Sequence, residues 1–121
     1  MKKVLIVEDH DLIRELYDMS LGSEYSLIFY SNGEDAIKDI SNICPDLIIM
    51  DIGLPGIDGI STIKIIRGRI GPKVPIIIIS GNLEIDHATA GLRLGVSELI
   101  SKPCSTQEIL DVVKRKLGDQ K

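Results

Sequence analysis

Three short runs of wholly apolar residues constrain the fold of this chain more than any other feature. They are VLIV at 4–7, LIIM at 47–50 and IIII at 76–79. A short continuous apolar run is typical of a strand that is covered on both faces, as in a parallel sheet between two helix layers. A strand with one exposed face would alternate apolar with polar residues. The three runs therefore predict the inner strands of an α/β protein.

Amphipathic stretches separate the apolar runs, which is the pattern of repeated strand–helix units. In the first stretch Leu12, Leu16 and Met19 recur at helical spacing. The last stretch repeats this pattern with Ile109, Val112, Val113 and Leu117. We predict strands at 3–7, 25–30, 46–50, 74–79 and 96–100, and helices at 11–21, 33–41, 59–69, 84–94 and 105–117.

Two of the five predicted strands are interrupted by polar residues, and these suit the edges of the sheet. They are YSLIFYS, which contains strand 25–30, and VSELIS, which contains strand 96–100. With right-handed crossovers the strand order becomes 2-1-3-4-5. The predicted fold class is α/β, a flavodoxin-like doubly wound (βα)5 domain with a five-stranded parallel sheet, spanning 1–121. Ligands of such sheets bind beyond the carboxyl ends of the strands, where the first and third strands diverge.

Two predicted helix starts carry a capping-box pattern. In this pattern a Ser side chain and a Glu three residues later each accept a hydrogen bond from the other's free backbone N–H. The pairs are Ser31 with Glu34 and Ser105 with Glu108. We expect both boxes to form.

Composition narrows the class of protein. Apolar residues make up 44% of the chain, with no Trp and one Phe, so the core must be aliphatic. The net charge of −4 argues against a nucleic-acid surface, which needs clustered Lys and Arg. Cys44 and Cys104 have neither metal-ligand nor disulfide spacing, so we expect reduced thiols. No signal peptide or membrane span is recognisable, and we expect a soluble, cytoplasmic protein without a membrane partner.

Polar side chains follow the predicted strands at the edge where this fold binds its ligands. Glu8 and Asp9 follow the first strand, Asp51 the third, Ser80 the fourth and Lys102 the fifth. Each of them alone would be explained by a turn, a helix cap or a solvated surface residue. Their convergence on one edge is not explained in that way. The pattern indicates a site.

Three carboxylates that share one cleft repel each other. Two unit charges at about 4 Å cost on the order of 4 kcal/mol at an effective dielectric constant of 20. A hard divalent ion would relieve this repulsion, and few carboxylates in an open site favour Mg²⁺ over Ca²⁺. We expect His10 to face away from the cleft if Asp9 points into it.

A carboxylate beside Mg²⁺, a hydroxyl and an ammonium group suits covalent phosphoryl chemistry. Asp51 could act as the nucleophile and become an aspartyl phosphate. Lys102 would neutralise charge on the phosphoryl oxygens. Ser80 could donate a hydrogen bond to the phosphoryl group once it is attached, which makes it a switch element.

The chain resembles the receiver domains of two-component response regulators. The resemblance rests on VLIVEDH, LIIMDIGLPGIDG, IIIISG and LISKP, in this order, and covers essentially the whole chain. The resemblance implies that Asp51 is the phosphoacceptor. It also implies that Asp9, Asp51 and the backbone carbonyl of Gly53 bind Mg²⁺ directly, whereas Glu8 binds it through water. Lys102 would contact the phosphoryl group, Ser80 would be the hydroxyl switch, and the Lys102–Pro103 bond would be cis.

The same resemblance implies the partners. The phosphoryl donor would be a histidine kinase or a histidine phosphotransfer protein, and the domain would promote only its own phosphorylation and dephosphorylation. A downstream effector would bind the face formed by helix 84–94, strand 96–100 and helix 105–117, which is also a candidate homodimer contact.

Two positions depart from the family pattern. Leu99 replaces an aromatic switch residue, and we expect it to pack as a core residue of the edge strand. Gly53 stands where the family often has a larger side chain, and with Asn82 it would border the site and tune hydrolysis.

Three alternatives compete with a phosphorylated receiver. A degenerate receiver acting as a scaffold is disfavoured by the intact acidic residues. A flavin carrier would need a hydroxyl- and glycine-rich phosphate loop after the first strand, where this chain has EDHD. An aspartate-nucleophile phosphatase would want a second carboxylate two residues after Asp51, where Gly53 stands.

Overall fold

The computed structural model describes residues 1–51, 59–80, 95–101 and 104–118. Strands and helices alternate from residue 3 to residue 80, as predicted. The elements are β1 (Lys3–Val7), α1 (Asp11–Leu21), β2 (Ser26–Tyr30), α2 (Gly33–Ile43), β3 (Leu47–Asp51), α3 (Gly59–Ile70), β4 (Ile76–Ser80), β5 (Glu98–Ser101) and α5 (Thr106–Leu117). The predicted helix 84–94 lies outside the described residues.

Element boundaries differ from the predicted ones by at most two residues, and some of the differences have a clear cause. β4 begins at Ile76, two residues later than predicted, and the residue before it is Pro75, which has no N–H to donate to a neighbouring strand. β3 continues to Asp51 because that residue still pairs with Ile79 of β4. The carboxylate of Asp51 therefore belongs to the strand end itself, rather than to the loop that follows.

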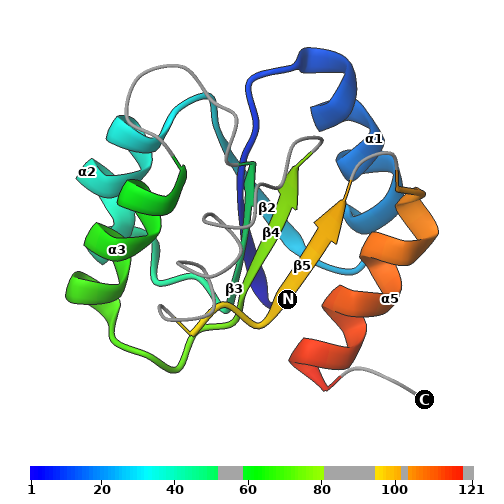
Figure 1. Cartoon of the computed structure of the whole chain (residues 1–121). Coiled ribbons are helices and arrows are strands. Elements are labelled where there is room, and N and C mark those ends of the chain that lie inside the picture. Colours follow the sequence, from blue (N-terminus) through cyan, green and yellow to red (C-terminus); the bar gives the residue numbers. More distant parts are fainter. Residues whose placement is uncertain (52–58, 81–94, 102–103, 119–121) are drawn as a thin grey trace.

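The five strands form one parallel sheet in the order β2-β1-β3-β4-β5, which confirms the predicted topology. Figure 1 shows α2 and α3 on one side of the sheet and α1 and α5 on the other. In the register, Val7 of β1 lies opposite Tyr30 of β2 and Met50 of β3. The carboxyl ends of these three strands therefore meet at one edge of the sheet.

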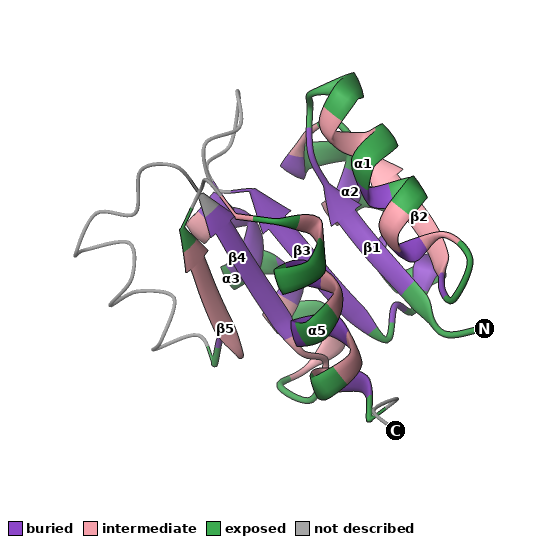
Figure 2. Cartoon of the chain, turned by 90° about the vertical axis from the view of Figure 1, so that its right-hand side faces the viewer, coloured by how far each residue is buried: buried purple, intermediate pink, exposed green. Residues whose placement is uncertain are grey.

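Burial separates the inner strands from the edge strands as predicted. The apolar runs of β1, β3 and β4 are at most 1% exposed, whereas every residue of β2 and three of the four in β5 are only partly buried. Figure 2 shows this contrast between β4 and β5. Successive residues of each inner strand enter different cores, one packed against α2 and α3 and the other against α1 and α5. Leu99 of β5 packs against the first core, as we predicted.

Helix α1 forms where predicted, but the apolar stripe from which it was predicted is largely exposed. Leu12, Leu16 and Met19 are 75%, 45% and 80% exposed, whereas Tyr17 and Leu21 are buried in the core. A second apolar stripe, made of Ile13, Tyr17 and Leu21, packs against the sheet instead. None of the helices in the described part of the chain is long and apolar enough to cross a membrane.

Only one of the two predicted capping boxes forms. At the start of α5, Ser105 Oγ accepts from the N–H of Glu108 at 3.1 Å, and Glu108 Oε1 accepts from the N–H of Ser105 at 3.3 Å. The predicted box of Ser31 with Glu34 is wrong. The N-cap of α2 is Asn32, whose Oδ1 accepts from the N–H of Asp35 at 2.8 Å, because the helix begins one residue later than that pattern requires.

Replacing Ser105 tests the capping box of α5. Ser105→Ala should lower the free energy of unfolding by about 0.5–2 kcal/mol, whereas Ser105→Gly should lower it by only a few tenths, because Gly is tolerated at an N-cap. Urea denaturation measures both values. Ser41→Ala, on the exposed face of α2, is the control and should change the value by less than about 0.5 kcal/mol. A larger loss for Gly than for Ala would contradict the N-cap assignment.

The edge strand β2 is tied to α2 by a hydrogen bond that predicts a pH effect. Tyr30 Oη donates to Asp39 Oδ2 at 2.7 Å. This bond, with smaller contributions from burial and nearby carboxylates, raises the pKa of Tyr30 to about 12. Because the folded state holds the phenol proton more tightly, the resulting stability is complete below the ordinary pKa of about 10. It is lost as pH rises through the folded value.

Asp39→Asn removes the charged acceptor and should return the pKa of Tyr30 toward about 10. NMR of ¹³C-labelled tyrosine follows this titration, with the signal assigned by Tyr30→Phe. An unchanged pKa in Asp39→Asn would show that the Asp39 carboxylate is not the cause.

Candidate functional site

The acidic pair Glu8 and Asp9 lies directly beyond β1. The backbone N–H of Glu8 donates to the carbonyl of Tyr30 at 2.9 Å, which continues the β1–β2 ladder by one bond. Although it is charged, Glu8 is only 1% exposed, whereas the Asp9 side chain is 33% exposed. A buried carboxylate must be paired or hydrogen-bonded, because desolvation of an unpaired charge is costly. Glu8 is therefore placed for a specific interaction.

Asp51 lies beside this pair at the end of β3. It is 8% exposed. Val7 and Met50 are opposite each other in the register, so Glu8 and Asp51 are the next residues of two adjacent strands. Adjacent strands lie about 4.8 Å apart. Two largely buried carboxylates thus occupy neighbouring positions at the carboxyl edge of the sheet.

Burial and nearby negative charges shift the pKa of the Tyr17 phenol on α1. Its pKa lies well above its ordinary value, chiefly because the side chain is buried and also because Glu8, Cys104 and Asp51 disfavour a further negative charge. The Tyr17 hydroxyl therefore stays neutral. Sequence reasoning missed this residue, since an aromatic residue on an amphipathic helix is usually a core residue.

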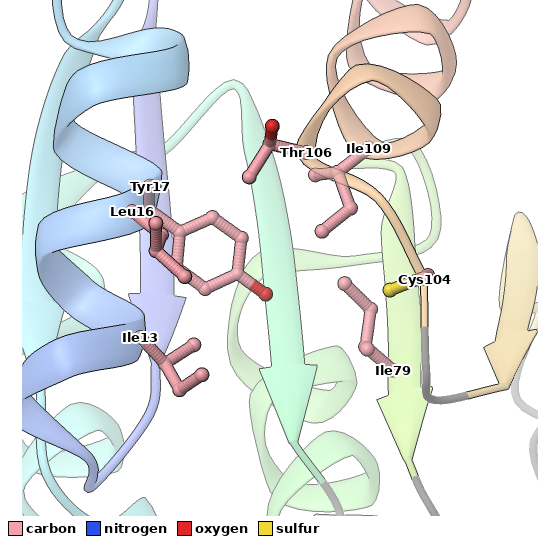
Figure 3. A pocket seen from close by; sticks show the side chains of 7 residues that line it. All are labelled: Ile13, Leu16, Tyr17, Ile79, Cys104, Thr106 and Ile109. Carbon is pink, nitrogen blue, oxygen red and sulfur yellow. The ribbon is translucent and has the colours of Figure 1, made fainter.

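Tyr17 also lines an apolar cavity of about 450 Å³ between α1 and α5. Figure 3 shows the Tyr17 ring and hydroxyl reaching across it toward Cys104 and Ile79. Its lining is mostly aliphatic: Ile13, Leu16, Tyr17, Ile79, Cys104, Thr106 and Ile109. A charged phosphoryl group does not suit such a lining, so we place the chemistry at the acidic edge.

His10 does not face away, in contrast to our expectation. Its Nδ1 lies 3.0 Å from Asp9 Oδ1 and 3.1 Å from Glu8 Oε1, and its backbone N–H donates to Glu8 Oε1 at 3.2 Å. The turn after β1 folds the imidazole, which is 70% exposed, back over both carboxylates. One potential ligand atom from each of the three residues lies within a span of 4.8 Å.

These residues fit a hard divalent cation. Glu8 and Asp9 bring carboxylate oxygens together beside the ring of His10, and Asp51, which is not part of this cluster, ends the adjacent strand. Oxygen ligands with room for water are the set that Mg²⁺ prefers. Gly53, the expected carbonyl ligand, lies outside the described residues.

Of the remaining residues near the predicted site, only Ser80 lies within the described part of the chain. Ser80 is the last residue of β4 and pairs with Ser101 of β5, so its backbone ends at the same edge as Asp51. Lys102 is the next residue after β5 in the sequence, but it lies outside the described residues, as do Pro103 and Asn82.

Comparisons with known proteins identify the family of this chain. The family model of the response regulator receiver domain matches residues 4–114. The chain is 36% identical over 114 residues, 93% of its length, to the alkaline phosphatase synthesis transcriptional regulatory protein PhoP of Bacillus subtilis (strain 168), of which this covers 47%. It is 35% identical over 105 residues, 84% of its length, to the Regulator of RpoS of Escherichia coli (strain K12), of which this covers 30%. The chain thus spans less than half the length of these curated relatives.

A solved structure supports the fold. The crystal structure of a CheY-like response regulator receiver domain protein from Methanospirillum hungatei JF-1 superposes with a TM-score of 0.92. The match covers 98% of this chain and 95% of that one, at 23% sequence identity. The family model, the sequence relatives and the shared fold lead to one conclusion: this chain belongs to the response regulator receiver domains, the signalling domains of two-component systems.

Proposed function

We propose that Asp51 accepts a phosphoryl group from the phosphohistidine of a histidine kinase or histidine phosphotransfer protein, in a reaction that requires Mg²⁺. The observation that carries this proposal is the burial of Glu8 at 1% exposure, next to Asp9 and one strand away from Asp51. An acidic edge of this kind is stable when a cation compensates the charges. The same cation would then attract a phosphoryl group toward Asp51.

The chemistry exchanges one bond for another. A carboxylate oxygen of Asp51 attacks phosphorus and forms the P–O bond of an acyl phosphate. The P–N bond of the donor breaks, and its electron pair returns to the imidazole nitrogen, which takes up a proton from water. Bound Mg²⁺ would supply charge neutralisation for the phosphoryl oxygens. Asp9, Asp51 and the carbonyl of Gly53 would hold the ion directly, and Glu8 through water.

Two further residues would convert phosphorylation into a conformational signal. Lys102 would contact the phosphoryl group, and Ser80 would donate a hydrogen bond to it only when it is present, which biases a two-state element. Leu99 packs against the core and supplies no aromatic ring for this switch. The signal would pass to an effector or output domain through residues 84–94, β5 and α5, a face that could also form a homodimer.

Replacing the phosphoacceptor tests the proposal. A small phosphodonor with Mg²⁺ should add one phosphoryl group to the wild type and none to Asp51→Asn, because the amide is not a nucleophile. Intact-mass measurement gives the result directly. Asp111→Asn on the exposed face of α5 is the matched control and should be labelled like the wild type. Equal labelling of Asp51→Asn and the wild type would remove Asp51 from its role.

Replacing Asp9 tests the metal requirement. Asp9→Ala should fold, because this side chain is partly exposed, and should need at least about tenfold more Mg²⁺ for half-maximal labelling. The labelling rate is measured against Mg²⁺ concentration, and circular dichroism checks the fold. Glu15→Ala, an exposed carboxylate of α1, is the control. A Mg²⁺ dependence in Asp9→Ala identical to that of the wild type would argue against the site.

A further inference from the structure

The guanidinium group of Arg14 connects helix α1 to two loops at the acidic edge. Its Nε donates to the backbone carbonyl of Glu8 at 2.8 Å. Its Nη2 donates to Ser31 Oγ in the turn between β2 and α2. The third nitrogen, Nη1, lies 3.9 Å from the exposed carboxylate of Asp11. The side chain is 26% exposed, so much of it is withdrawn from solvent.

These contacts hold the backbone of Glu8 from two sides. Its N–H is bonded to the carbonyl of Tyr30 in β2, and its carbonyl accepts from Arg14 in α1. The peptide groups on both sides of the Glu8 Cα are therefore fixed, and the direction of the side chain is fixed with them. Asp9 follows immediately, so the second peptide group also sets where Asp9 begins.

The geometry distinguishes this role from charge neutralisation. Arg14 Nε bonds the carbonyl of Glu8, and Nη2 bonds a hydroxyl, so neither of these two bonds is made to a carboxylate. Two donors that point in different directions are a property of the planar guanidinium. A lysine at this position could reach one acceptor, but it could not bridge both loops in the same way.

We propose that Arg14 is a positioning residue for the metal site. By bridging the carbonyl of Glu8 to Ser31, it holds the Glu8–Asp9 segment in the geometry that binds a divalent cation. Without this bridge, repulsion among the carboxylates would turn the segment outward. The inference rests on the proposed Mg²⁺ site but concerns a residue that touches neither the ion nor the phosphoryl group.

The test measures Mg²⁺ binding to the unphosphorylated protein, with MgCl₂ as the probe and NMR amide shifts as the readout. Arg14→Met should weaken Mg²⁺ binding by about 10–100-fold, which is the range for loss of a supporting contact. Arg14→Lys should lie between Arg14→Met and the wild type. In the absence of Mg²⁺, the amide signals of Glu8 and Asp9 should shift in Arg14→Met.

Ser31→Ala tests the second half of the bridge without altering the charge. It should weaken Mg²⁺ binding in the same direction as Arg14→Met but by less. The effects of the two substitutions should not add in the double variant, because both remove the same bridge. This variant also keeps the proposal testable if Arg14→Met does not fold.

Arg69→Met is the matched control. Arg69 Nη1 donates to the carbonyl of Ile37 at 3.0 Å, so it also joins two elements through a guanidinium–carbonyl bond, but on the α2–α3 side of the sheet. It should leave Mg²⁺ affinity within about twofold of the wild type even where it lowers stability.

The outcomes separate this inference from the proposed function. If the wild type binds Mg²⁺ at this edge and Arg14→Met binds it equally well, the positioning role is wrong and the proposed function stands. If Arg69→Met weakens binding as much as Arg14→Met, the effect is general loosening of the fold, and the inference is again overturned. If the wild type does not bind Mg²⁺, both fail.

Discussion

The burial of one carboxylate next to another is the interaction on which this structure depends. Glu8 is almost fully withdrawn from solvent, and Asp51 ends the adjacent strand. Desolvation and mutual repulsion both oppose this arrangement. Two buried carboxylates are stable at this edge only if a cation, or hydrogen-bond donors fixed nearby, compensate their negative charge. The backbone N–H of His10, which donates to Glu8 Oε1, and the proposed divalent ion are two parts of that compensation.

The fold brings these groups together by register rather than by local sequence. Glu8 and Asp51 are far apart in the chain, but parallel pairing of β1 with β3 places them side by side. Both strands are apolar on both faces, and the two helix layers fix their positions in the sheet. The acidic edge is thus supported by an aliphatic core, while helix α1 contributes Arg14, which bonds the carbonyl of Glu8.

Sequence reasoning succeeded where one physical signal dominated. The apolar runs predicted the inner strands and the strand order, because a strand that is covered by helices on both sides is apolar on both faces. The prediction failed where two neighbouring sets of residues fit the same sequence pattern. Helix α1 carries two apolar stripes, and periodicity alone does not say which one faces the sheet. Ser31 and Asn32 are both good N-caps, and one residue of register decided between them. The position of His10 depends on a turn that pattern rules do not describe.

A paramagnetic ion gives the most direct test of the central claim that Glu8, Asp9 and Asp51 share one divalent cation. Mn²⁺ added in trace amounts to the full chain should broaden NMR signals around these three residues first, and titration should show a single site of this kind per chain. Mg²⁺ should reverse the broadening by competition. Broadening spread evenly over the exposed acidic residues, or centred away from the ends of β1 and β3, would contradict the account.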